Sequence, residues 1–256
     1  MRIDKKSLNL LREMTFADFR TKHINAYLGY LWSLLNPLLL FGAMYLIFSV
    51  FLEWKSPEYT VYMLLGIILW TFFSDTTFKG MTAVYSKAGI ITKVNFPREI
   101  IVFSVGLNSI ITLTLNLCIF AVFFIISPVK FSLNVLLLPI FLVQLIFFSL
   151  GISFALSAFF LRFRDLNYIW QFLLKIGFWL TPVIIPLSKI PQKYYPILFI
   201  NPLTNIIKGA RDVVIYGNAP SFFNIALFLI VSIIVFFAGY FLFRKMEKTF
   251  ADYVVF

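Results

Sequence analysis

Six long runs with few or no charged residues alternate with short charged segments, and this pattern predicts a chain that crosses a membrane repeatedly. A helix needs about 20 apolar residues to cross roughly 30 Å of hydrocarbon. The predicted crossings cover residues 28–52, 59–77, 100–126, 133–161, 168–186 and 222–243. We therefore expect an all-α membrane protein in which residues 1–256 form a single transmembrane domain with six spans.

Two further segments predict helical structure that does not cross the membrane. In residues 1–26, apolar or weakly polar side chains recur at spacings of three and four: Leu8, Leu11, Thr15 and Phe19. This spacing predicts an amphipathic helix on the membrane surface, with a solvated basic leader as the alternative. The apolar run 194–207 has 14 residues and contains Pro196 and Pro202, so it is too short and too broken to span. We expect a re-entrant or interfacial segment that borders a pathway.

The charged residues orient the predicted crossings. The chain has 22 basic and 11 acidic residues, a formal net charge of +11. Segments 1–22, 79–99, 162–167 and 244–256, which the predicted crossings place on one side, contain 15 of the basic residues. The positive-inside rule puts this side, with both termini, in the cytoplasm. Topology and contact with anionic membrane lipids thus explain most of the charge, and nucleic acid is not an expected partner.

The composition argues against several kinds of chemistry. Hydrophobic residues make up 61% of the chain, and the single Cys118 and single His23 disfavour redox and zinc sites. No Gly-Lys pair occurs, so the chain has no P-loop with which to hydrolyse ATP. Asp165, Asp212 and Asp252 each stand alone, whereas an enzyme acting on lipid-linked sugars needs clustered carboxylates for a metal–diphosphate. We expect no catalytic residue, metal or cofactor on this chain.

Several motifs carry a family resemblance over nearly the whole chain. Residues 27–38 read YLGYLWSLLNPL and resemble the start of the first span in type-2 ABC transporter permeases that export polysaccharides. Further stretches resemble the same family in order and spacing: 94–99 (VNFPRE), 163–165 (FRD), 181–186 (TPVIIP), 201–204 (NPLT) and 211–212 (RD). Within the family, the chain looks most like the membrane subunits of O-antigen polysaccharide exporters.

The resemblance implies a homodimer of six-span subunits in the bacterial inner membrane. Each dimer would assemble with two copies of a separate nucleotide-binding ATPase subunit, which binds ATP and Mg. The complex would move an undecaprenyl-diphosphate-linked O-antigen polysaccharide from cytoplasm to periplasm. Export of capsular polysaccharide, teichoic acid or another amphiphile by the same fold is the main alternative. A stand-alone channel and a membrane enzyme acting on lipid-linked sugars are the others.

A channel for polysaccharide is expected to combine aromatic faces with hydrogen-bonding groups, because sugars present both hydroxyls and apolar C–H faces. We predict a sugar-stacking lining from the first, second and fifth crossings: Tyr27, Tyr30, Trp32, Tyr45, Trp70, Trp170, Phe178 and Trp179. The alternative for each is an interfacial belt, a lipid-facing position or a packed core. Lys175, a cation within the fifth crossing, is expected to face the lumen or the dimer seam.

The segment before the first crossing is predicted to admit the lipid carrier. Gly29 accepts backbone angles closed to other residues and, beside Leu28, would act as a hinge. Arg20, Lys22 and His23 would attract the diphosphate headgroup, with ordinary anionic lipids as the alternative ligand.

The resemblance implies roles for two other regions. The cytoplasmic loop 79–99 is expected to carry a coupling helix that docks in the ATPase, with these contacts: Lys87, Lys93, Asn95, Phe96, Pro97, Arg98 and Glu99. Region 187–221 is expected to hold short periplasmic gate helices that include Pro196, Asn201, Pro202, Arg211 and Asp212. For Arg211 and Asp212 we favour a structural role, either in a mutual pair or in holding the last gate helix.

Overall fold

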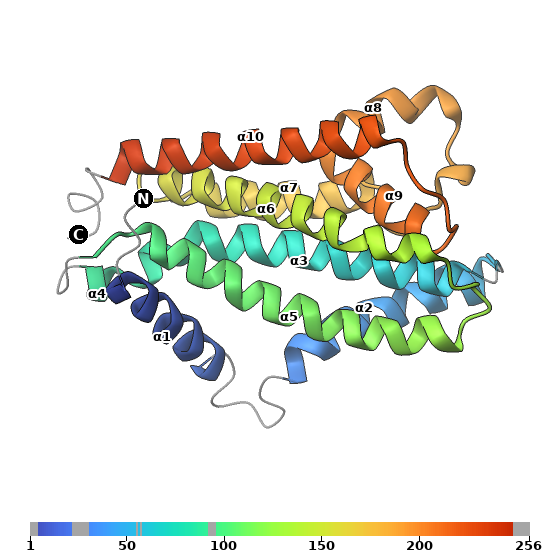
Figure 1. Cartoon of the computed structure of the whole chain (residues 1–256), viewed down its shortest axis with the longest axis horizontal. Helices are drawn as coiled ribbons and strands as arrows, with labels where there is room; N and C mark the ends of the chain where they lie inside the picture. The colour runs from blue at the N-terminus through green and yellow to red at the C-terminus, as the bar shows by residue number, and fades with distance from the viewer. Residues whose placement is uncertain (1–4, 22–30, 55, 57, 92–95, 248–256) are drawn as a thin grey trace.

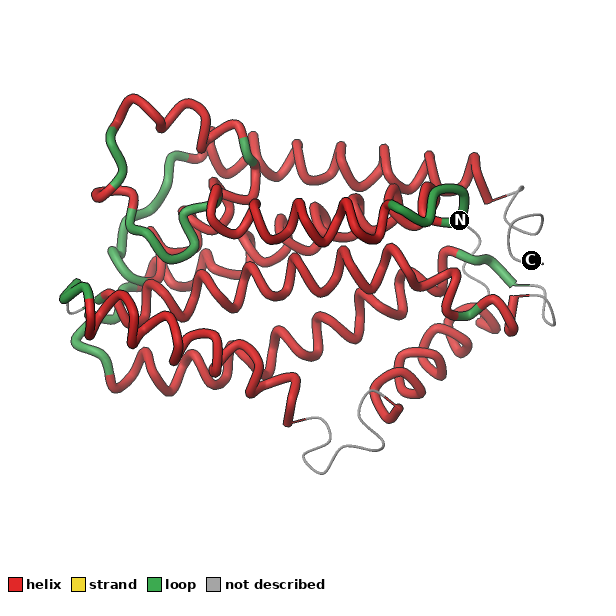
Figure 2. The backbone as a smooth tube through the Cα atoms, turned by 180° about the vertical axis from the view of Figure 1, so that it is seen from behind, coloured by secondary structure: helices red, strands yellow, loops and turns green. Residues whose placement is uncertain are grey.

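The computed structural model describes residues 5–21, 31–54, 56, 58–91 and 96–247 as an elongated bundle of helices (Figure 1). The longer helices are α1 (Lys5–Thr21), α2 (Trp32–Tyr45) with its π-helical continuation η2 (Leu46–Phe51), α3 (Tyr59–Ser86), α5 (Glu99–Ile126), α6 (Leu138–Phe160), α7 (Leu166–Leu180) and α10 (Phe222–Met246). The shorter ones are α4 (Ala88–Ile91), η3 (Leu133–Leu137), η4 (Leu187–Lys189), η5 (Gln192–Tyr194), α8 (Tyr195–Ile200) and α9 (Pro202–Val214). The described part of the chain contains no strand (Figure 2), which confirms the all-α class.

The two ends of the bundle differ in what they hold. One end, called here the α4 end, holds α4, the last turns of α3 and α10, and the start of α5 (Figure 1). The opposite end, called here the α8 end, holds α8, α9 and the first turns of α3 and α10. Helix α1 lies obliquely against α5, where Met14 and Thr15 are buried. A helix is therefore confirmed in the predicted amphipathic segment.

Helix α3 forms the centre of the bundle. It packs on α5, α6, α2, α7 and α9, and the side chains from Val61 to Leu69 are almost completely buried. Helix α10 packs mainly on α6 at the outer side of the bundle. That contact is close: a Cβ added to Gly239 would overlap the backbone of Gly151, and one added to Gly151 would overlap the backbone at Phe236. Small residues let helices in a membrane approach each other to this degree.

Five of the six predicted crossings are helices long and apolar enough to span a membrane: Trp32–Phe51, Tyr59–Ser86, Glu99–Ile126, Leu133–Phe160 and Phe222–Met246. In the predicted fifth crossing, 168–186, the helix is shorter than expected: α7 has 15 residues and ends at Leu180. Thr181 is extended, with φ −90° and ψ 133°. The cause is Pro182, since the residue before a proline is pushed out of the helical region and the proline has no N–H to donate.

The predicted loop 79–99 is also shorter than expected. Helix α3 continues to Ser86, nine residues beyond the predicted end at Thr77, and the four-residue α4 follows it. The ion pair between Asp75 and Lys79, one turn apart, lets these charged residues stay in the helix. Charge was therefore a poor marker of where this helix ends.

The apolar run 194–207 consists of two short helices that meet at an extended residue, Asn201. Pro196 lies in the first turn of α8, and Pro202 begins α9. Proline suits this position because the first helical N–H groups have no partner within the helix. The side-chain Oδ1 of Asn201 accepts a hydrogen bond of 3.0 Å from the amide of Leu203 and so caps α9.

Candidate functional site

A polar cavity of about 340 Å³ lies between α2, α3 and α5. Its polar lining consists of Trp32, Ser33, Asn36, Thr71, Asp75, Lys79, Ser109, Thr112 and Asn116. Apolar walls come from Ile68, Phe72 and Leu113. Polar side chains inside segments of this length and apolarity are expensive unless they face protein or water, so their concentration at one place marks a functional site.

The lining groups of this cavity suit an uncharged, hydroxyl-rich ligand. Asp75 and Lys79 neutralise each other, and their side chains are 41% and 42% exposed. Asn116 donates its side-chain amide to the carbonyl of Thr112 over 3.0 Å, and its Oδ1 can still accept a hydrogen bond. Hydroxyls, amides and a neutral ion pair together offer both donors and acceptors without a net charge.

The sequence analysis missed most of this cavity, although the signal was present. Thr71, Asp75 and Lys79 recur every four residues in α3, and Ser109 and Asn116 lie two turns apart in α5. Such spacing places polar residues on one face of each helix. A search for polar stripes inside apolar runs would have found both faces. Which neighbouring helix each stripe faces is a matter of tertiary packing.

The predicted sugar-stacking residues that the structure describes lie in different surroundings. Trp32 lines the polar cavity and is 43% exposed, and Trp179 on α7 is 55% exposed. Trp70 is 6% exposed and packs edge-on against Phe178 at 5.7 Å between ring centroids. Trp170 donates its indole N–H to Thr77 over 3.2 Å. Trp70 and its neighbours therefore pack the contact between α3 and α7 within the single subunit.

The structure describes only some of the other predicted lining and entrance residues. Tyr45 is half-buried at the end of α2, where its ring lies 5.8 Å from that of Phe41. Six predicted positions lie outside the described residues: Lys22, His23, Tyr27, Leu28, Gly29 and Tyr30. Arg20 belongs to α1, but its side chain is likewise not described. The hinge and the headgroup contacts stay predictions.

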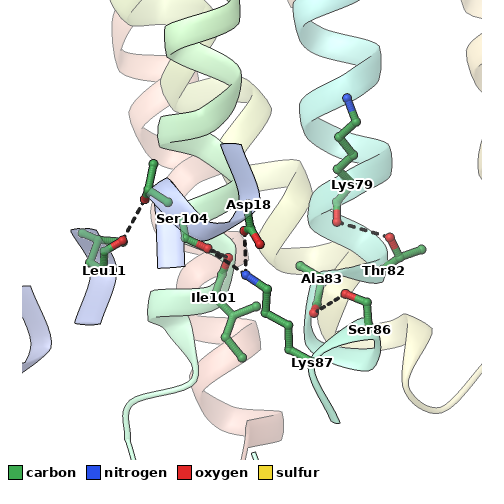
Figure 3. Close-up of polar contacts among 10 residues, drawn as sticks. Leu11, Asp18, Lys79, Thr82, Ala83, Ser86, Lys87, Ile101 and Ser104 are labelled. Atoms are coloured by element: carbon green, nitrogen blue, oxygen red, sulfur yellow. Dashed lines mark hydrogen bonds and ion pairs between the residues drawn. The ribbon is translucent and has the colours of Figure 1, made fainter. Parts of the chain in front are cut away.

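At the α4 end, Lys87 points inward to neighbouring helices (Figure 3). Its ammonium group lies 2.6 Å from Asp18 of α1 and 3.5 Å from the hydroxyl of Ser104 in α5. The Lys87 side chain is 15% exposed and that of Asp18 30%. Lys87, which was predicted to contact the ATPase, thus pairs within the subunit and joins α1 to the end of α3.

Arg98 and Glu99 are also bound within the subunit. Glu99 is 5% exposed and accepts a hydrogen bond of 3.2 Å from Arg244 at the end of α10. Arg98 donates from its guanidinium to the backbone carbonyl of Glu247. Together these contacts fix the start of α5 to the end of α10. Phe96 is half-buried and Pro97 exposed, while Lys93 and Asn95 lie outside the described residues.

Other side chains are exposed at the α4 end, and they are not among the residues predicted to contact the ATPase. Tyr85 is 44% exposed, Ile90 45% and Phe163 57%. Arg164 lies 3.7 Å above the ring of Tyr85, so it joins the turn before α7 to the end of α3. Aromatic and aliphatic side chains around an arginine are typical of the centre of a protein interface.

At the α8 end, Arg211 is buried and holds three segments together. Its guanidinium donates to the backbone carbonyls of Tyr62 (3.1 Å), Pro182 (2.6 Å) and Val183. It also lies 3.5 Å above the ring of Tyr62. A Cβ at Gly66 would overlap the guanidinium, so a glycine is required there.

This arrangement fits a structural role for Arg211 and corrects the idea that it pairs with Asp212. Asp212 instead pairs with Lys208, one turn earlier in α9. Asn201 adds a second link to the end of α7, since its side-chain amide donates to the hydroxyl of Thr181 over 3.1 Å. The end of α7, the first turns of α3 and α9 are thus joined into one unit.

A helical bundle with five helices that are long and apolar enough to cross a membrane defines a multi-pass membrane protein. The family model of the ABC-2 type transporter matches residues 10–215, and the chain belongs to this family.

Relatives match over nearly the full length. The O-antigen export system permease protein RfbA of Klebsiella pneumoniae is 29% identical over 95% of this chain and 94% of its own. RfbA of Myxococcus xanthus is 26% identical over the same shares. The polysialic acid transport protein KpsM of Escherichia coli is 24% identical over 90% of this chain and 91% of its own.

Proposed function

We propose that this chain is the permease subunit of an exporter that moves undecaprenyl-diphosphate-linked O-antigen polysaccharide from cytoplasm to periplasm. The observation that carries the proposal is the similarity to O-antigen export permeases over 95% of the chain. The chain has no Gly-Lys pair, so ATP hydrolysis belongs to a separate nucleotide-binding subunit. The subunit would lie in the inner membrane with both termini on the cytoplasmic side, in agreement with the distribution of basic residues.

The polar cavity between α2, α3 and α5 supports a sugar substrate. It offers donors and acceptors without net charge, and Trp32 adds an aromatic face. A saccharide needs both, since hydroxyls and apolar C–H faces alternate around its ring. The cavity would hold a sugar unit on its way through the membrane.

The exposed face of α7 supports a homodimer. Phe172 is 62% exposed and Trp179 55%, and Lys175 is exposed on the same helix. A cation at this depth needs water or a protein partner rather than lipid. Pairing two subunits through α7 would place Lys175 and Trp179 beside a shared pathway and would remove the lysine from lipid.

The α4 end is the surface that would dock on the ATPase. Three side chains are exposed there: Tyr85, Ile90 and Phe163. Arg164 lies over the ring of Tyr85, whereas Lys87 and Glu99 act within the subunit. The contact with the motor would therefore rest on exposed apolar side chains rather than on the charged residues that the sequence suggested.

Capsular polysaccharide is the second candidate substrate, because the polysialic acid transport protein KpsM is also similar over most of the chain. Its identity of 24% is lower than the 29% for an O-antigen permease, which favours O-antigen.

Co-purification with the ATPase encoded beside its gene would test the proposal. We expect a stable complex whose ATPase activity rises when lipid-linked O-antigen polysaccharide is added, and no activity when the P-loop lysine of the partner is replaced. Ile90→Glu, at a residue 45% exposed at the α4 end, should prevent assembly. Tyr194→Glu, at a residue 46% exposed at the α8 end, is the matched control and should assemble normally.

Two results would contradict the proposal. A folded permease that forms no complex with the folded ATPase would remove the energy source. A complex that responds to lipid-linked capsular polymer but not to lipid-linked O-antigen would favour the second candidate.

A further inference from the structure

A second cavity, of about 680 Å³, opens at the α8 end, away from the polar cavity described above. Its wall is formed by Glu53, Trp54, Ser56, Glu58, Tyr59, Tyr62, Pro186, Ser188, Lys189 and Tyr216. The volume lies within the range of about 300–1,000 Å³ that is typical of small-molecule sites. Aromatic rings and acidic side chains dominate this wall, which no role assigned above explains.

The backbone at Glu53 is unusual and shapes this cavity. Glu53 has φ 52°, in the left-handed region that residues other than glycine rarely adopt. This turn brings Trp54 back over the end of η2, where its amide donates to the carbonyl of Phe48 over 3.0 Å. Glycine would adopt this conformation at lower cost. A glutamate held here at such a cost suggests that its carboxylate is used.

Aromatic rings form a continuous series along one side of the cavity. Trp54 lies 5.1 Å from Phe48 and 6.1 Å from Tyr59, and Tyr59 stacks on Tyr62 at 6.4 Å between centroids. The wall also includes Tyr216, whose pKa is raised by burial; its phenol is therefore protonated at neutral pH and can donate a hydrogen bond. Flat apolar rings with polar tips are the surfaces on which the C–H faces of sugar rings pack.

The charge of the described lining is negative. Glu53 and Glu58 make no side-chain hydrogen bond or ion pair with any described residue. Of the neighbouring cations, Arg211 is bound to backbone carbonyls and Lys208 to Asp212. Lys189, 5.8 Å from the ring of Trp54, is the one cation in the described wall. Two unpaired carboxylates accept hydrogen bonds from hydroxyls and repel other carboxylates.

We propose that this cavity is a binding site for a neutral saccharide unit, with Glu53 and Glu58 accepting its hydroxyls and Trp54 packing on its ring. The inference rests on the proposed function and deepens it, because it names the class of sugar. The cavity lies beyond the break at the end of α7, at the opposite end from the proposed ATPase contact. It would hold units of the polymer as they leave the pathway, and it would disfavour polymers of acidic sugars.

Binding of soluble oligosaccharides to the full chain in lipid nanodiscs would test this site without the ATPase. The probes are neutral tetrasaccharides of glucose, galactose or mannose, with tetragalacturonate as the acidic comparison, and saturation-transfer NMR gives each Kd. We expect at least one neutral probe to bind. Tetragalacturonate should bind about tenfold more weakly, or not at all, because Glu53 and Glu58 repel its carboxylates.

Two carboxylate variants separate binding from folding. Glu53→Gly keeps the left-handed turn, so the protein should fold and elute as the wild type does, yet bind the neutral probe about tenfold more weakly. Glu58→Gln should weaken binding similarly, whereas Glu13→Gln, at an exposed carboxylate of α1, should not. Trp54→Phe should keep part of the binding that Trp54→Ala loses.

The site would be refuted if no neutral probe bound, if tetragalacturonate bound as tightly, or if a folded Glu53→Gly protein bound as well as the wild type. These outcomes are independent of ATPase assembly. Assembly and substrate-dependent hydrolysis without binding here would leave the exporter standing and remove this site. Binding of the neutral probe without assembly would support this site and contradict the proposed exporter function.

Discussion

Replacement of Arg211 by methionine is expected to destabilise the α8 end of the bundle. Methionine is also long and flexible, but it has no charge and no donor. The change removes hydrogen bonds to the carbonyls of Tyr62, Pro182 and Val183, as well as the contact with the ring of Tyr62. The end of α7 would then lose the hydrogen bonds by which Arg211 links it to α3 and α9.

The size of the expected loss in stability depends on which hydrogen-bond donors remain for each carbonyl after the substitution. Pro182 still accepts from the hydroxyl of Tyr62 at 3.4 Å, but no other described donor reaches the carbonyl of Val183. An unsatisfied buried carbonyl costs about 1–3 kcal/mol. A desolvated cation over an aromatic ring contributes about 2 kcal/mol. Loss of the buried guanidinium also relieves its desolvation cost. We expect a net loss of about 2–4 kcal/mol in the free energy of unfolding.

Equilibrium unfolding in bicelles, measured by steric trapping, would give this free energy. Lys208→Met is the matched control on the same helix, because Lys208 pairs with Asp212 at a side chain that is 42% exposed. An exposed pair contributes about 0–1 kcal/mol. The loss of unfolding free energy in Arg211→Lys should lie between those of Arg211→Met and Lys208→Met, since lysine keeps the charge but not the planar fork of donors.

Hydrogen exchange gives a local readout of the same change. The backbone amides of residues 181–186 should exchange faster in Arg211→Met than in Lys208→Met. The reasoning would be refuted if the two methionine variants unfolded with the same free energy, or if the amides after α7 were equally protected in both.

Two further predictions concern the packing of the helices. Gly239→Val would force a side chain into the backbone of Gly151, so we expect a loss of about 1–3 kcal/mol and a low yield of monodisperse protein. Gly42→Val is the control, since a Cβ there would meet no described side chain or neighbouring helix within 4 Å. Glu99→Gln would replace the carboxylate that pairs with Arg244 by a neutral amide at a site where Glu99 is 5% exposed. Because Arg244 would lose its charged partner there, the change should lower the thermal midpoint at neutral pH. An unchanged midpoint would show that this pair does not hold α5 to α10.

Much of the fold was predictable from local signals. Apolar runs of more than 20 residues specify a crossing by length alone, and the helices Glu99–Ile126 and Phe222–Met246 follow the predicted bounds closely. Prolines also act locally, so Pro182 ends α7 and Pro202 begins α9. Helix α3 passed its predicted end because charged residues one turn apart can pair within a helix.

The site was less predictable because its contacts join residues far apart in the chain. Lys87 lies in a basic segment that suggested a docking loop, yet its ammonium group meets Asp18, 69 residues earlier. Arg211 reaches the carbonyl of Tyr62, 149 residues away. Neither partner carries a signal that identifies the other, and a backbone carbonyl carries none at all.

The sequence by itself determined the class of protein, the presence of most of the long helices, and the places where prolines break them. These features depend on the transfer of apolar residues into lipid and on the local geometry of the backbone. Only the tertiary structure decided which apolar faces meet protein: Trp70 packs in the core, whereas Trp179 remains exposed. The physical reason is that lipid and a protein core are equally apolar, so a helix that is apolar on every side does not encode which side will be buried.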